Sequence, residues 1–205
     1  MAQHLRVHPT DPQDRLLKIA AGVLHKGGLV IYPTDTAYAI ACRMGDKVAL
    51  EKIIALRKLD KNHQFSLACR DLSDLATYAK VENADYRLLK RNTPGPFTFI
   101  LQASREVPKR LVHPKKKLIG LRVPNHPIVQ GLLEVFGEPM VTATLRLDDA
   151  DENPGDIEEI VETLGNHRDI DVILDGGPCG IKTSTVVDMS GGDPVVVRQG
   201  LGVLS

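Results

Sequence analysis

Apolar residues near the start of the chain recur at helical spacing and then give way to a short apolar run. Between Asp11-Pro12 and Gly27-Gly28 they return every three or four positions, which predicts a helix that Asp11 caps and Pro12 begins. The next run, residues 29–32, is rich in β-branched and aromatic side chains and predicts a buried strand that Pro33 ends. A helix therefore leads directly into the first central strand.

The rest of the chain alternates between short apolar runs and amphipathic segments. The runs predict strands at residues 37–42, 65–69, 97–101, 118–123, 140–144, 171–174, 184–188 and 194–198. The amphipathic segments predict helices at residues 83–91, 126–136 and 155–164, and two more that Asp46 and Asp71 cap. Several strands follow one another too closely for a parallel crossover, so the sheet should be mixed, with a tight turn at residues 191–194.

Composition places the chain among single-domain globular proteins. Its 205 residues are 42% hydrophobic and 25% charged, which fits one domain over residues 1–205. With no Trp and only 4% aromatic residues, the core must come mainly from Ile, Leu, Val and Ala, as suits helices packed on a sheet. The predicted fold class is therefore α/β.

The sequence also bears on location and metal content. No apolar run approaches the roughly 18 residues needed to span a bilayer, and residues 1–6 contain no apolar signal core, so we expect a cytoplasmic protein without a membrane partner. Cys42, Cys69 and Cys179 form no Cys-x-x-Cys pair, and we expect them to be reduced and structural. The seven histidines lack zinc-like spacing, so we expect no protein-bound transition metal.

The formal net charge of zero conceals two oppositely charged segments. Residues 105–117 carry a net charge of +5, and Pro108 and Pro114 favour an exposed loop that can attract a polyanion; a solvated surface is the alternative. Residues 148–175 carry a net charge of −10, which we interpret as a solvated surface that keeps the protein soluble.

Two hydroxyls and a carboxylate follow the first strand. Thr34, Asp35 and Thr36 come after Pro33, at a strand end, where α/β sheets commonly place ligands, and they can cradle a polar ligand. The alternative is an ordinary turn in which Asp35 bonds its own backbone.

A second candidate is the glycine-rich segment 175–185. Glycines let the backbone approach a phosphate closely, and Lys182 and the hydroxyl residues 183–185 add charge and donors. The Walker A spacing G-x-x-x-x-G-K-[ST] is missing, however, and a strand rather than a helix follows. A plain glycine-rich turn is the alternative.

Cations at the ends of elements form the remaining candidates. Arg122 and Arg198 each end an apolar strand, where a guanidinium can form a bidentate fork with a phosphate or carboxylate, although each alone is more often a surface ion pair. Arg57-Lys58 ends a helix, where cations also simply complement the helix dipole.

Taken together, these segments resemble the YrdC/YciO superfamily, whose best-known members are threonylcarbamoyl-AMP synthases. The resemblance is carried by residues 26–42, 55–70, 93–101, 120–127, 138–144 and 175–200. Its most specific parts are Tyr-Pro-Thr-Asp-Thr-x-Tyr at 32–38, Thr-Pro-Gly-Pro-Phe-Thr at 93–98, Arg-Val-Pro at 122–124 and Ser-Thr at 184–185. Ala-Leu-Arg-Lys-Leu at 55–59 and Cys-Arg-Asp-Leu-Ser-Asp-Leu at 69–75 look most like the YciO branch.

The resemblance implies a YrdC-like twisted, mixed sheet flanked by helices, with a concave, positively charged surface for a nucleotide or double-stranded RNA. In the synthases, threonine and bicarbonate form a carbamate that attacks the α-phosphate of ATP. This step releases pyrophosphate and gives an intermediate for modifying adenosine in tRNA. Such chemistry depends mainly on positioning, on Mg²⁺ that neutralises phosphate charge, and on cations aimed at the transition state.

The resemblance also assigns roles residue by residue. The implied roles are catalysis for Arg57 and Lys58, substrate binding for Thr34, Thr36, Thr142 and Thr144, and nucleotide binding for Arg122, Ser184, Thr185 and Arg198. The basic segment supplies the candidates for RNA binding, which are Arg110, Lys115, Lys116 and Lys117.

Three departures from the synthase motifs fall at the reacting end of the pocket. The Lys-x-Arg motif corresponds to Arg57-Lys58-Leu59, the Ser-x-Asn motif to Thr142-Ala143-Thr144, and the Gly-Leu-Gly motif to Ala39-Ile40-Ala41. One cation and one Asn are therefore missing, and losing one charge-stabilising group can cost on the order of 10²-fold in rate. The sequence leaves open whether Arg146 restores a cation.

Two functions of different class follow. One is an ATP-using enzyme of the synthase type, with weak or altered activity, whose partners are ATP, threonine and bicarbonate. The other is a non-synthase protein of the YciO type that binds tRNA, other double-stranded RNA or the ribosome through the positive surface.

Overall fold

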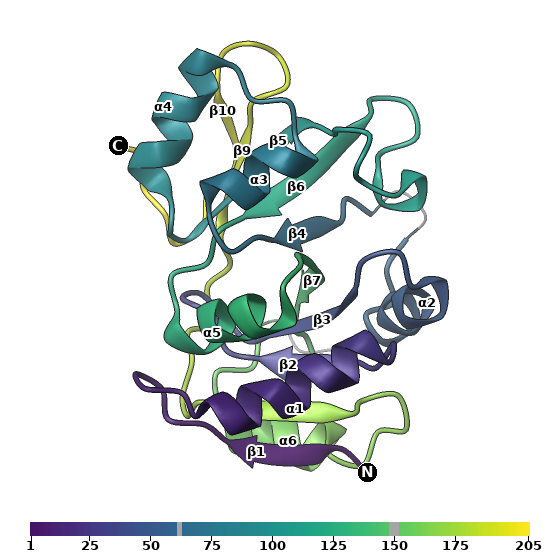
Figure 1. Cartoon of the computed structure of the whole chain (residues 1–205). Coiled ribbons are helices and arrows are strands. Elements are labelled where there is room, and N and C mark those ends of the chain that lie inside the picture. Colours follow the sequence, from purple (N-terminus) through teal and green to yellow (C-terminus); the bar gives the residue numbers. More distant parts are fainter. Residues whose placement is uncertain (61–62, 148–151) are drawn as a thin grey trace.

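A ten-stranded sheet runs through the computed structural model of the protein, which describes residues 1–60, 63–147 and 152–205 (Figure 1). Its strands are β1 (Gln3–Arg6), β2 (Val30–Tyr32), β3 (Ala39–Arg43), β4 (Ser66–Ala68), β5 (Phe97–Gln102), β6 (Leu118–Arg122), β7 (Met140–Thr144), β8 (Val172–Asp175), β9 (Thr185–Asp188) and β10 (Val195–Arg198). The helices of the described residues are α1 (Asp14–His25), α2 (Lys47–Leu56), α3 (Leu72–Tyr78), α4 (Asn83–Asn92), α5 (Pro127–Phe136), α6 (Ile157–Leu164) and the 3₁₀ helix η1 (Lys109–Leu111).

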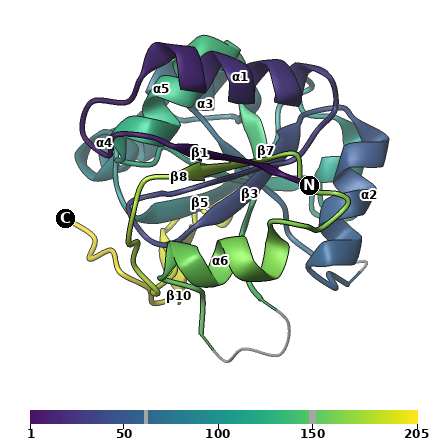
Figure 2. The same ribbon diagram turned by 90° about the horizontal axis from the view of Figure 1, so that it is seen from below.

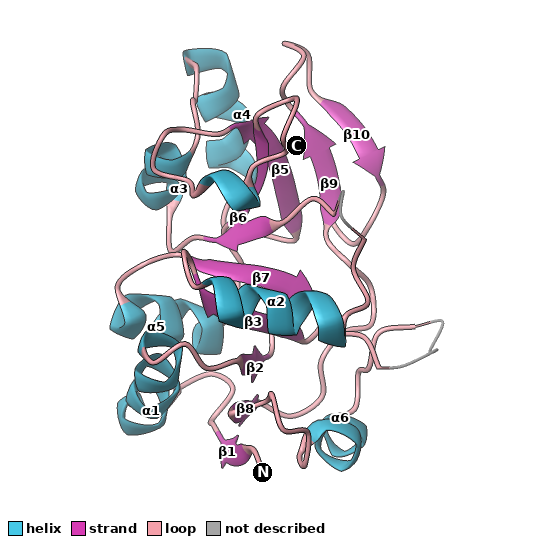
Figure 3. Ribbon diagram, turned by 90° about the vertical axis from the view of Figure 1, so that its right-hand side faces the viewer, coloured by secondary structure: helices cyan, strands magenta, loops and turns pink. Residues whose placement is uncertain are grey.

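The strands are ordered β1-β8-β2-β3-β7-β4-β6-β5-β9-β10, and the predicted mixed sheet is confirmed. β2 and β3 are antiparallel, as are β9 and β10, whose connection contains the predicted turn at 191–194. β8 and β2, β4 and β6, and β5 and β9 are parallel, and longer connections join them. The sheet twists strongly, so that β8 is seen end-on in Figure 3 while β7 runs across the view.

Side-chain caps decide where several helices begin. The predicted caps are confirmed for α2, where Asp46 accepts a hydrogen bond from the backbone of Ala49 (2.9 Å), and for α3, where Asp71 accepts one from Asp74 (2.8 Å). The predicted Asp11 cap of α1 is wrong, because α1 begins later, after Gln13.

A closed turn before α1 explains the later start. The Nδ1 atom of His8 accepts a hydrogen bond from the backbone N–H of Asp11 (3.0 Å), and the backbone N–H of His8 donates to Oε1 of Gln13 (3.0 Å). These bonds hold residues 8–13 outside the helix.

Two short elements were not expected from the sequence. β1 is a mostly exposed edge strand that pairs in parallel with β8, and His4 of β1 bonds Asp175 of β8 (2.7 Å). Its sequence, Gln-His-Leu-Arg, shows too little alternation to predict a strand. The second element, η1, lies in the basic segment that was predicted to be a loop, where Leu111 is buried.

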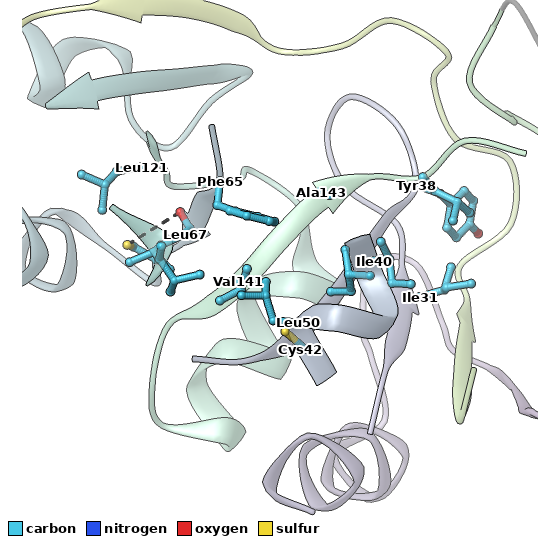
Figure 4. Packing of buried hydrophobic residues seen from close by; sticks show 14 of the residues in the cluster. Ile31, Tyr38, Ile40, Cys42, Leu50, Phe65, Leu67, Leu121, Val141 and Ala143 are labelled. Atoms are coloured by element: carbon cyan, nitrogen blue, oxygen red, sulfur yellow. Dashed lines mark hydrogen bonds between the residues drawn. The ribbon is translucent and has the colours of Figure 1, made fainter. Parts of the chain in front are cut away.

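Two clusters of buried side chains hold the helices against the sheet. One lies between the sheet and helices α1 and α5, and the larger one joins the sheet to α2, α3, α4 and α6. Figure 2 shows α1 and α5 on one side of β1 and β8, with α6 on the other. Figure 4 shows part of the larger cluster, where Leu50 of α2 lies beside Cys42 and Val141 of the sheet. Most buried residues are Ile, Leu, Val and Ala, as predicted, although Tyr38 and Phe99 are also fully buried.

The three cysteines are free, as expected, and burial raises the pKa of Cys42 to about 12. None of the described helices combines the length and the apolar character that crossing a bilayer requires.

Candidate functional site

A cavity of about 420 Å³ lies over six adjacent strands of the sheet, β3-β7-β4-β6-β5-β9. Its floor consists mainly of small or polar side chains that alternate with core residues along these strands, with Ile100 and Val186 as apolar exceptions. In β5, for example, Thr98 faces the cavity between the buried Phe97 and Phe99, and in β4 Ser66 precedes the buried Leu67. The floor residues are Ala39, Ser66, Thr98, Ile100, Gly120, Arg122, Thr142, Thr144, Ser184 and Val186.

Four arginines from different parts of the chain line this cavity. Arg57 ends α2, Arg122 ends β6, Arg146 follows β7, and Arg198 ends β10. The described lining residues include no Asp or Glu. The cavity is therefore suited to a ligand with several negative charges.

Neutral oxygens orient two of these guanidinium groups. Nε of Arg57 donates to the backbone carbonyl of Thr144 (2.6 Å), and Nη2 of Arg198 donates to that of Ser184 (2.8 Å). The Ser184 hydroxyl is in turn bonded to that of Thr98 (2.7 Å). A carbonyl fixes the direction of a cation without cancelling its charge, so both groups remain available to an anion.

The cations are close enough to influence one another. Burial lowers the pKa of Arg57, and the neighbouring Arg146 lowers it further. Burial also lowers the pKa of Arg198, with smaller contributions from Arg122 and Arg146. His63, which also lines the cavity, has a pKa lowered by burial and then by Arg57. An anion in the cavity would relieve this mutual repulsion.

The turn after β2 supports Arg122. The Thr34 hydroxyl accepts hydrogen bonds from the backbone N–H groups of Thr36 (3.1 Å) and Ala37 (3.2 Å) and donates to the carbonyl of Ala37 (2.6 Å). The carboxylate of Asp35 is paired with Arg122, which also donates to the Thr36 hydroxyl (2.9 Å). Thr34, rather than Asp35, therefore bonds the local backbone, and Arg122 forms a buried ion pair instead of a surface one.

The glycine-rich segment packs against this turn. The Tyr38 hydroxyl donates to the carbonyl of Gly177 (2.7 Å). Gly180 lies so close to Thr36 that a Cβ at position 180 would stand 2.1 Å from the Thr36 carbonyl oxygen. These contacts fit the alternative of a structural turn, while Thr183 and Ser184 at its end reach the cavity.

The structure brings together many, but not all, of the residues singled out from the sequence. Those that line the cavity are Arg57, Thr36, Arg122, Thr142, Thr144, Ser184 and Arg198. Thr34 and Lys58 are absent from its lining. Thr185 also lies outside it, because its hydroxyl donates to the Gly202 carbonyl (2.7 Å) and accepts from the Gly200 N–H (3.0 Å). The RNA-binding candidates Arg110, Lys115, Lys116 and Lys117 are exposed on the connection between β5 and β6.

Several cavity residues were missed from the sequence. Ser66 and Thr98 could have been found, because each places a hydroxyl in an otherwise apolar strand. His63, Gln64 and Asn153 lie in connections and carry no such signal. Arg146, which the sequence left open, does line the cavity.

The departures from the synthase motifs occupy different environments. Leu59, at the place of a cation, packs against the larger core cluster. Ala39 and Ala41 both belong to the cluster beneath α1 and α5, but Ala39 also lines the cavity, whereas Ala41 is fully buried.

The acidic segment 148–175 is only partly the solvated surface that was expected. Asp171 accepts a hydrogen bond from the backbone of Leu29 (2.9 Å), and Asp156 caps α6. Asp148, Asp149 and Asp151 lie outside the described residues. In the part of the chain that the structure describes, no group of three His, Cys, Asp or Glu residues could hold a metal ion.

Comparisons with known proteins place this arrangement in a family. The family model Sua5_yciO_yrdC, described as "Telomere recombination", matches residues 22–200. The uncharacterized protein YciO of Escherichia coli (strain K12) is 47% identical over 202 residues, which are 98% of this chain and 97% of YciO. The crystal structure of E. coli YciO superposes with a TM-score of 0.94, covering 99% of this chain and 98% of that one.

Among more distant relatives, one is named as an enzyme, and the structure of another contains a bound amino acid. The threonylcarbamoyl-AMP synthase of Bos taurus is 31% identical over 181 residues, which are 85% of this chain and 63% of the synthase. The crystal structure of P. abyssi Sua5 complexed with L-threonine is 26% identical, with a TM-score of 0.85, and the match covers 98% of this chain and 57% of Sua5. The family model and the YciO match together show that the chain belongs to the Sua5/YciO/YrdC family.

Proposed function

We propose that the cavity binds ATP through its phosphates and that the protein is an enzyme of the threonylcarbamoyl-AMP synthase type with weak or altered activity. The observation that carries the proposal is the convergence of four guanidinium groups on one cavity whose described lining contains no carboxylate. A triphosphate carries several negative charges and planar sets of oxygens that guanidinium groups match. The synthase relatives support the same function.

The remaining polar groups suit the second substrate. Thr36, Thr142 and Thr144 present hydroxyls to the cavity, where they can bind the polar groups of an amino acid. In the proposed reaction, the amino nitrogen of threonine forms a bond to bicarbonate carbon and water leaves. A carbamate oxygen then attacks the α-phosphorus of ATP, the bond to the β-phosphate oxygen breaks, and pyrophosphate leaves with the electron pair.

Mg²⁺ enters this proposal as part of the substrate. The described cavity lining offers hydroxyl oxygens but no Asp or Glu, whereas Mg²⁺ prefers carboxylate and phosphate oxygens. The ion would therefore be carried by the phosphates of ATP, and the arginines would bind the remaining charge.

The altered motifs are the reason for proposing weak or altered activity. The apolar Leu59, which packs against the core, cannot stabilise charge, and a threonine side chain at position 144 is shorter than that of Asn. Arg146 supplies a replacement cation from a different point of the cavity wall. Because transition-state stabilisation depends on where each charge lies, a displaced cation can retain ATP binding and still lower the rate.

The test is pyrophosphate release from ATP, Mg²⁺ and bicarbonate, with L-threonine present or omitted and D-threonine as the matched control. We expect release that depends on L-threonine and a product with the mass of threonylcarbamoyl-AMP. Retained ATP binding with release that another amino acid supports would indicate an altered substrate. Absence of both ATP binding and release would contradict the proposal.

A second candidate function, RNA binding, is favoured by the basic segment between β5 and β6. Arg110, Lys115, Lys116 and Lys117 are all exposed there, without a place in the cavity. β6 connects this segment to Arg122 at the cavity, so one strand joins the two positive regions. We propose that the segment contacts the phosphate backbone of tRNA or other double-stranded RNA.

Replacing Lys115, Lys116 and Lys117 together by Ala should weaken RNA binding and reduce its salt dependence. Three lost phosphate contacts would lower the slope of log K against log salt by about 2 to 3. Fluorescence anisotropy with labelled tRNA at several salt concentrations measures this slope, and ATP binding by the same variant provides the control. Unchanged RNA affinity would rule out this segment as the contact surface.

A further inference from the structure

We propose that Asn153 recognises the nucleoside part of the bound nucleotide, with its side-chain oxygen accepting a hydrogen bond from an N–H or O–H group of that nucleoside. This inference rests on the proposed function, because it concerns the part of ATP that the arginines do not bind. Asn153 precedes α6 and lies between two cavities.

The second cavity adjoins the arginine-lined one. It has a volume of about 440 Å³, and the two cavities share Asn153 and Thr183 in their linings. No arginine is present among the described residues of the second cavity, and its two charged residues, Glu152 and Lys182, have opposite signs. The lining also includes the exposed apolar side chain of Ile181 and the amide of Gln199. This mixture suits a planar, uncharged heterocycle and a sugar better than phosphate.

Asn153 is held firmly but has an unused acceptor. Only 7% of the residue is exposed, and its Nδ2 group donates to the backbone carbonyl of Ile181 (2.6 Å). Its Oδ1 atom is buried and has no hydrogen-bond partner among the described residues. Buried carboxamide oxygens are nearly always hydrogen-bonded, because leaving one unpaired is costly.

The chemistry of this oxygen indicates which kind of ligand group can bond to it. It is an acceptor, so it selects a donor and would repel a phosphate or carboxylate oxygen. In the proposed complex, the arginines bind the phosphates of ATP. In the rest of the molecule, the hydrogen-bond donors are the adenine amino group and the ribose hydroxyls. A site that hydrogen-bonds a donor discriminates strongly against an analogue that lacks it.

The experiment compares Asn153→Ala with the wild-type protein in binding ATP and inorganic tripolyphosphate, measured by calorimetry. We expect the variant to bind ATP about tenfold more weakly, because one hydrogen bond to a buried group is lost. Its affinity for tripolyphosphate should be unchanged. Asn92→Ala is the matched control, because Asn92 is also buried but bonds Ser205 near the C-terminus. It should leave both affinities unchanged.

Analogues on the wild-type protein identify the donor without any change of fold. Weaker binding of ITP than of ATP would assign the adenine amino group, and weaker binding of 2′-deoxy-ATP would assign the ribose 2′-hydroxyl; Asn153→Ala should erase whichever preference appears. Equal loss of ATP and tripolyphosphate binding in Asn153→Ala, or no loss of either, would overturn this inference alone. If neither ligand binds the wild-type protein, the proposed function fails, and this inference fails with it.

Discussion

Arg122→Ala is expected to lower the free energy of unfolding by about 3–5 kcal/mol, the cost of leaving a buried charge without its partner. The partner is Asp35, whose side chain is 12% exposed and whose second oxygen, Oδ2, is buried without a hydrogen-bond partner among the described residues. Loss of the Arg122 guanidinium also removes a donor from the hydroxyl of Thr36 (2.9 Å). Urea denaturation at pH 7 measures the change.

A double variant separates the structural and the ligand-binding roles of Arg122. Replacing Asp35 by Asn and Arg122 by Met together removes both charges, so the variant should recover most of the stability lost in Arg122→Ala. ATP binding, however, should stay about 10- to 100-fold weaker in both variants, since a hydrogen bond to a charged group contributes about 1.5–3 kcal/mol. The control is Arg168→Ala, because the Arg168 side chain is 91% exposed.

Either of two results would contradict this account. If the double variant is as unstable as Arg122→Ala, the buried charge of Asp35 is not the cause of the instability. If Arg122→Ala binds ATP as tightly as the wild-type protein, Arg122 does not contact the phosphates, and Arg57, Arg146 and Arg198 would have to bind them alone.

The ion pair between Asp35 and Arg122 also affects how the cavity presents its charges. Of the four cavity arginines, only Arg122 is paired with a carboxylate among the described residues. The pair holds Arg122 in place and partly neutralises it, while Arg57 and Arg198 keep their full charge beside neutral carbonyls. An anionic ligand would therefore be attracted mainly by Arg57, Arg146 and Arg198, and would find Arg122 already oriented by Asp35.

Much of the architecture could be predicted because the local sequence patterns favour the same helices and strands that the fold contains. Alternating and continuous apolar runs predicted most strands, and the capping side chains of Asp46 and Asp71 marked two helix starts. The start of α1 could not be predicted, because it depends on a ring nitrogen of His8 that closes a turn before the helix. β1 was missed because its pairing with β8 comes from a distant part of the chain.

The site was harder to predict than the fold. The sequence shows that Arg122 and Arg198 lie at the ends of strands. It does not show which strands are neighbours in the sheet, because that depends on tertiary pairing. Thr185 and Ser184 are adjacent, yet period-two alternation turns only Ser184 toward the cavity and directs the Thr185 hydroxyl to the C-terminal residues. A motif alone cannot distinguish two such neighbours. It also cannot show that the turn after β2 directs the hydroxyl of Thr34 to the backbone, while Thr36 lines the cavity.

Thr34→Val is expected to lower the free energy of unfolding by about 2–4 kcal/mol, although valine has nearly the same shape. The substitution leaves the backbone N–H groups of Thr36 and Ala37 without their shared acceptor, and each buried unpaired group costs about 1–3 kcal/mol. It also removes the hydroxyl donor from the carbonyl of Ala37. Thr34→Ser keeps the hydroxyl and should lose far less stability in the same urea denaturation.

The comparison with Thr36 decides whether the Thr34 hydroxyl serves the fold or the substrate. Thr36 lines the cavity and Thr34 does not, so Thr36→Val should weaken ligand binding at a smaller cost in stability. If Thr34→Val instead keeps the wild-type stability and loses affinity for threonine, its hydroxyl contacts the amino acid, as the family resemblance implies. The hydrogen bonds favour the first outcome, because the one hydroxyl proton of Thr34 is already donated to Ala37 and its lone pairs accept from two backbone amides.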